Sequence, residues 1–76
     1  MHEKLITFIQ EEFLTEPGTA ITNETRLISS GMIDSFSLVS LQVFIEKEFG
    51  KKIPAAAITR ESFDTVNKMV EVIRQF

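Results

Sequence analysis

The feature that most restricts the fold is the spacing of apolar residues between positions 35 and 50. They recur every three or four positions, which places them on one stripe of a helix. They are Leu38, Leu41, Ile45 and Phe49. Asp34 or Ser35 can cap the start by accepting a backbone N–H bond, and Gly50 is typical of the residue that ends a helix. The segment therefore predicts a helix that opens at Asp34-Ser35 and runs to about Phe49.

Two further segments have helical spacing. The first carries Leu5, Ile6, Ile9 and Phe13. Pro17-Gly18 would stop this helix. Asp64 or Thr65 would cap the last helix. Its apolar face would hold Val66, Met69, Val70 and Ile73.

The long polar stretch at 16–33 is expected to be a loop. It contains four apolar residues that would pin it to the core, namely Leu27, Ile28, Met32 and Ile33. A short helical turn is expected at 23–28, and Thr59 can cap another at 60–63. Ile53-Pro54 should be extended, because a residue before proline avoids the helical region. The sequence thus predicts an all-α fold, a small helical bundle of three longer helices plus one or two short ones.

Composition narrows the class of protein. The chain has 76 residues and no cysteine, so we expect one domain over 1–76, stabilised by apolar packing. A net charge of −3 argues against nucleic-acid binding. Glu3, Glu11 and Glu12 interrupt the first segment, which excludes a secretory signal or a membrane span. We expect a soluble, cytoplasmic monomer.

The helix after Ser35 has a second apolar stripe. Phe36, Val39 and Val43 lie roughly opposite the core stripe at 100° per residue. Either the helix is central and buried all round, or this stripe docks partners. Lys47 is a further docking candidate, against the alternative of a solvated helix face.

Ser35 is the candidate for chemistry. A serine at the start of a helix is ordinarily only a cap. Here it follows Asp34 at the end of a long polar loop and precedes Phe36. A helix N-terminus also favours a phosphate, because free N–H groups and the helix dipole attract negative charge.

These residues resemble a known family. Gly31-Met32-Ile33-Asp34-Ser35-Phe36 is similar to the G-x-x-D-S-(L/F) attachment motif of acyl carrier and peptidyl carrier proteins. The resemblance continues through the E-x-x-F-G pattern at 46–50, Ile53-Pro54 and the F-x-T-V pattern at 63–66. It covers essentially the whole chain.

The resemblance implies that a phosphopantetheinyl transferase moves 4'-phosphopantetheine from coenzyme A onto Ser35. The terminal thiol of the arm would then carry an acyl or aminoacyl group as a thioester, passed from an activating ligase to a downstream transferase. Asp34 matches the acidic residue of the motif, which would cap the helix and help the transferase dock. The chain would be a carrier and no enzyme, and no metal would be needed.

The variant of the motif resembles that of D-alanyl and other aminoacyl carrier proteins. Fatty-acid carriers place several acidic residues along the helix after the serine, whereas this chain has Ser37, Ser40 and Lys47 at matching places. This difference favours a dedicated pathway. The alternative is an unmodified helical protein-interaction module, in which Ser35 is only a cap. A free-standing enzyme lacks a convergent set of catalytic groups.

Overall fold

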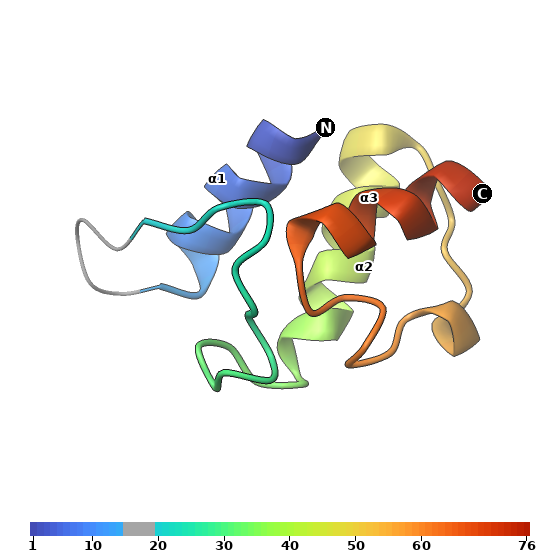
Figure 1. The fold of residues 1–76 in the computed structure, drawn as a ribbon. Coiled ribbons are helices and arrows are strands. Elements are labelled where there is room, and N and C mark those ends of the chain that lie inside the picture. Colours follow the sequence, from blue (N-terminus) through green and yellow to red (C-terminus); the bar gives the residue numbers. More distant parts are fainter. Residues whose placement is uncertain (15–19) are drawn as a thin grey trace.

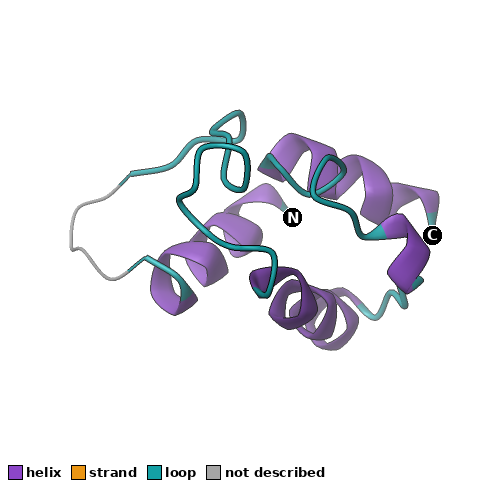
Figure 2. Ribbon diagram, turned by 90° about the horizontal axis from the view of Figure 1, so that it is seen from below, coloured by secondary structure: helices purple, strands orange, loops and turns teal. Residues whose placement is uncertain are grey.

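The computed structural model describes residues 1–14 and 20–76. In these residues the elements are α1 (His2–Glu12), α2 (Ser37–Phe49), the short 3-10 helix η1 (Ala55–Ala57) and α3 (Val66–Gln75). The described parts of the chain contain no strand. Figures 1 and 2 show the three α-helices arranged around a common centre, with a long loop leading into α2. The predicted all-α fold is confirmed.

The core draws on every α-helix and on the loops between them. Its most deeply buried side chains include Leu5 and Ile9 of α1, Leu41 and Ile45 of α2, and Phe63. Predicted core faces are therefore confirmed for α1 and α2, although Phe13 and Phe49 are only partly buried. The predicted face of α3 is buried in full: Val66, Met69, Val70 and Ile73.

The ends of α1 and α3 follow local capping rules. The helix α1 ends at Glu12, and the N–H of Phe13 still donates to the carbonyl of Ile9 at 3.0 Å. The stop predicted at Pro17-Gly18 lies outside the described residues. Thr65 caps α3, because its Oγ1 accepts a hydrogen bond from the backbone N–H of Lys68 at 3.1 Å.

Among the short elements, one prediction is wrong and one is confirmed. Positions 23–28 form no helix, because Thr22 and Thr25 close a tight turn through a 2.8 Å bond from Thr22 N–H to Thr25 Oγ1. The turn capped by Thr59 is present, with Ser62 N–H donating to Thr59 Oγ1 at 3.0 Å. The short helix η1, after extended Pro54, was not predicted.

The apolar residues of the long loop do pin it to the core, as predicted. Leu27, Ile28 and Ile33 are buried, and Met32 is partly buried against the same cluster. A loop with few backbone partners of its own gains its order from such burial. The loop therefore approaches the start of α2 in one defined position.

Candidate functional site

The chain enters α2 through a tight turn. The N–H of Ser37 donates to the carbonyl of Asp34 at 3.1 Å, and the N–H of Leu38 to that of Ser35 at 3.2 Å. These are bonds between residues three apart, the spacing of a 3-10 helix, which is common where α-helices begin. The regular helix consequently starts at Ser37 rather than at the predicted Asp34-Ser35.

Asp34 takes the capping role at this turn. Its Oδ1 accepts hydrogen bonds from the backbone N–H of Ser37 at 3.3 Å and from the Ser37 hydroxyl at 3.4 Å. The side chain of Ser35 makes no hydrogen bond within residues 1–14 and 20–76. Ser35 is exposed, so its hydroxyl is open to solvent and is not engaged as a cap.

A phosphodiester on Ser35 fits this geometry. The hydroxyl can be modified without breaking a hydrogen bond of the described structure, and its exposure leaves room for a long arm. The backbone N–H groups of Ser35 and Phe36 donate no bond inside the described ranges. Such groups at the start of a helix attract the negative charge of a phosphate.

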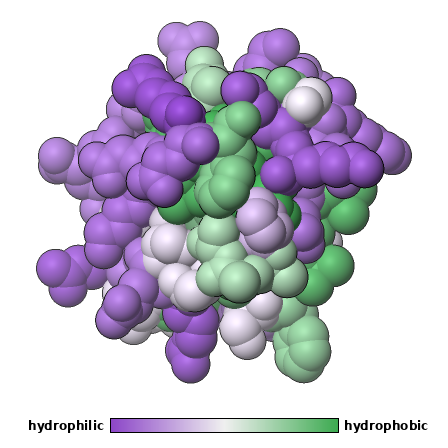
Figure 3. Space-filling model, turned by 90° about the vertical axis from the view of Figure 1, so that its right-hand side faces the viewer, coloured by the Kyte–Doolittle hydropathy of each residue, from purple (hydrophilic) through white to green (hydrophobic). Residues whose placement is uncertain are grey.

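The second stripe of α2 lies on the surface. Phe36 is 83% exposed, Val39 64% and Val43 48%, whereas Leu41 and Ile45 on the core stripe have no exposed surface. The explanation that α2 is buried all round is therefore wrong. Lys47 is also exposed. Figure 3 shows one face of the molecule, on which apolar side chains reach the surface in a band between hydrophilic flanks.

A buried carboxylate fixes the loop that precedes the motif. Asp64, 8% exposed, accepts bonds from the backbone N–H groups of Ile28 and Ser29, each at 2.9 Å, and from the Ser29 hydroxyl at 2.8 Å. The pKa of Asp64 is lowered, chiefly by the Ser29 backbone N–H, although burial opposes the shift. Sequence reasoning considered Asp64 only as a helix cap and missed this role.

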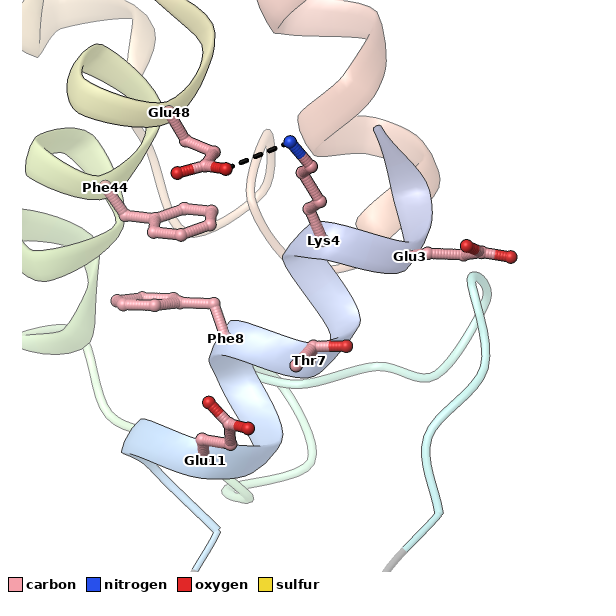
Figure 4. Close-up of a pocket in the computed structure, with 7 residues that line it drawn as sticks. All are labelled: Glu3, Lys4, Thr7, Phe8, Glu11, Phe44 and Glu48. Atoms are coloured by element: carbon pink, nitrogen blue, oxygen red, sulfur yellow. Dashed lines mark hydrogen bonds and ion pairs between the residues drawn. The ribbon is translucent and has the colours of Figure 1, made fainter.

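A hollow of about 350 Å³ opens on the surface beside α1 and the later turns of α2 (Figure 4). The rings of Phe8 and Phe44, which line it, stack with centroids 4.0 Å apart, and Lys4 pairs with Glu48 at 3.0 Å. These contacts hold the two helices together. The hollow is lined by residues of α1 and of the later turns of α2. Ser35 lies before the first turn of α2 and does not line it, so we assign the hollow to the packing of the two helices.

Comparison with known proteins identifies the class of site. Residues 3–73 match the family model described as "Phosphopantetheine attachment site". The chain belongs to this family. As a family member, it is a carrier that holds 4'-phosphopantetheine covalently, and it is not itself a catalyst.

Similar proteins are carriers of similar length. The D-alanyl carrier protein of Streptococcus uberis is 35% identical over 75 residues, covering 99% of this chain and 92% of that protein. The D-alanyl carrier protein of Streptococcus suis is 29% identical over 68 residues, covering 90% of this chain and 84% of its own. These matches support the function of an acyl or aminoacyl carrier.

A solved structure gives the same fold. Its description is "Crystal structure of FAD-dependent dehydrogenase", and the matched chain is 32% identical with a TM-score of 0.80. The match covers 93% of this carrier and 100% of that chain. The whole of the solved chain therefore matches this carrier, and the two chains are of similar size.

No described helix is long and apolar enough to cross a membrane. The described residues also hold no cluster of three histidine, cysteine or acidic side chains arranged for a metal ion. Membership of the carrier family implies partner enzymes, such as a ligase and a transferase.

Proposed function

We propose that Ser35 is the attachment residue and that the carrier delivers an aminoacyl group, first of all D-alanine. The observation that carries the attachment is the exposed Ser35 hydroxyl, which is free of hydrogen bonds in the described structure while Asp34 caps the helix. The family match states the group to be attached. A serine that served only as a cap would have its hydroxyl on a backbone N–H.

Attachment requires little of the carrier beyond presentation. The Ser35 oxygen forms the new bond to phosphorus, and the pyrophosphate bond of coenzyme A breaks, which releases adenosine 3',5'-bisphosphate. The hydroxyl proton passes to a base on the phosphopantetheinyl transferase. Asp34 orders the turn, since its carboxylate holds the Ser37 N–H and hydroxyl. The backbone N–H groups of Ser35 and Phe36, which donate no bond in the described structure, would favour the phosphate charge at the start of the turn.

Partner enzymes would dock on the exposed stripe of α2, which we call the docking stripe: Phe36, Val39 and Val43. A few apolar anchors dominate most interfaces, and Phe36 is the largest and most exposed of the three. Lys47 lies farther along the same helix and would contact the rim of a partner. Rim charges affect association rate more than affinity. We further propose that the carrier acts as a monomer in the cytoplasm.

The relatives support D-alanine as the cargo, because they are D-alanyl carrier proteins. A second candidate comes from the solved structure, whose description names an FAD-dependent dehydrogenase. In that case the cargo would be an acyl or aminoacyl thioester that the flavin enzyme oxidises as the flavin is reduced.

A loading assay tests D-alanine as the cargo. The phosphopantetheine form is incubated with ATP and with one ligase at a time, from a panel that activates D-alanine, L-alanine or larger amino acids, and the protein mass is measured. D-alanine should be loaded in preference to L-alanine and to larger amino acids. Loading of another amino acid, with D-alanine refused, would contradict the D-alanyl assignment while leaving attachment at Ser35 intact.

A further inference from the structure

We propose that Asp64 is a positioning residue for the attachment of phosphopantetheine. It would hold the loop at 27–33, here called the anchored loop, against the start of α3 and so fix the place from which Ser35 is presented. This inference rests on the proposed attachment at Ser35.

Four hydrogen bonds join Asp64 to the beginning of the anchored loop. Its carboxylate accepts from Ile28 N–H and Ser29 N–H at 2.9 Å and from Ser29 Oγ at 2.8 Å. Its backbone carbonyl accepts from Leu27 N–H at 2.7 Å. A carboxylate can accept several bonds at once, so one buried side chain satisfies donors that would otherwise need separate partners.

The anchored loop passes this constraint on to the attachment motif. The N–H of Gly31 donates to the carbonyl of Ile28, and the N–H of Ile33 donates to the carbonyl of Leu27, each at 3.0 Å. These two bonds close the loop on itself. Gly31 has a φ of 83°, a conformation that glycine adopts without strain. Ile33 is buried at the end of the loop, and the next residue, Asp34, opens the turn that carries Ser35. Asp64 is thus connected to Ser35 through bonded and buried backbone.

The expected consequence is on recognition rather than on the chemical step. If the loop is released, only a fraction of the carrier molecules present Ser35 correctly. The apparent affinity of the transferase for the carrier is then reduced in proportion to that fraction. Asp64→Ala should therefore raise the KM for the carrier about tenfold, with kcat at saturation within about twofold of the unaltered protein. Asp64→Asn should stay within about threefold in KM, because an amide oxygen can still accept both backbone bonds.

Thr65→Ala supplies the matched control. It also weakens the start of α3, because it removes the cap on Lys68 N–H, but it leaves every Asp64 bond in place. All variants are assayed for transfer from coenzyme A at a temperature where circular dichroism shows them folded. Thr65→Ala should keep its KM within about twofold, as a change away from the loop should.

The outcomes are distinct. An unchanged KM in folded Asp64→Ala, or an equal rise in Thr65→Ala, would overturn the positioning role. If Asp64→Ala does not fold, Asp64→Ser decides, since its shorter side chain cannot hold both the Ile28 and Ser29 N–H groups that the carboxylate holds: a raised KM supports the role and an unchanged KM overturns it. Failure of the unaltered protein to accept phosphopantetheine would instead count against the proposed function itself.

Discussion

Truncation of Leu41 tests the assignment of the core face of α2. The side chain has no exposed surface and lies in the middle of the helix, between Leu38 and Ile45. Leu41→Ala removes buried carbon and leaves a cavity, at a cost of about 2–5 kcal/mol. A domain of this size has a free energy of unfolding of about 4–11 kcal/mol at 0.05–0.15 kcal/mol per residue. The substitution should therefore remove a large share of the stability.

Thermal unfolding followed by circular dichroism measures this loss. For a domain of 60–100 residues, each kcal/mol shifts the Tm by about 4–8 °C, so Leu41→Ala should lower it by about 10 °C or more. Val43→Ala on the same helix is the matched control. Val43 is 48% exposed, and its truncation should change stability by no more than about 0.5 kcal/mol. A Tm of Leu41→Ala within about 2 °C of the unaltered protein would refute the assignment.

Three further predictions concern the docking stripe, the end of α2 and the buried carboxylate. Val43→Asp should remain folded yet lose cargo loading, because it places an unpaired charge in the interface; unfolding by circular dichroism would contradict this. Gly50→Ala should cost about 1–2 kcal/mol in urea unfolding. Gly50 has a φ of 67°, and apart from its chain neighbours nothing lies within 4 Å of the added carbon, so the strain is in the backbone alone. The pKa of Asp64 is lowered from its ordinary 3.8, so the carboxylate contributes its full stabilisation above that pH. This stabilisation is lost as the pH falls through the lowered pKa. Unfolding measured from about pH 6 to acid should therefore show a steeper loss of stability in the unaltered protein than in Asp64→Asn.

The helices could be predicted because their signals are local. The spacing of Leu38, Leu41 and Ile45 and the glycine at position 50 are read within one segment, and the structure confirms that helix and its buried face. The regular helix starts at Ser37, later than predicted, because the turn before it takes the tighter 3-10 form. The same residue types suit either form of turn, so the sequence does not distinguish them. Capping rules allow either Asp34 or Ser35 to cap this helix and do not choose between the two residues.

The site was less predictable where it depends on distant parts of the chain. Whether Val39 and Val43 are buried could not be read from their spacing, since a central helix and a helix with a docking stripe share the same pattern. Asp64 was considered as a cap because it directly precedes α3 with Thr65. Its actual partners, Ile28 and Ser29, lie in a distant segment and carry no periodic signal.

Intact mass after reaction with coenzyme A tests the central claim most directly. The unaltered protein, Ser35→Ala and Ser40→Ala are each incubated with coenzyme A, magnesium and a broad-specificity phosphopantetheinyl transferase. Ser40 is an exposed serine in α2, five residues after Ser35, and so serves as the control. The account predicts the mass of one phosphopantetheinyl group on the unaltered protein and on Ser40→Ala, and none on folded Ser35→Ala. A modified Ser35→Ala, or an unmodified natural sequence, would contradict it.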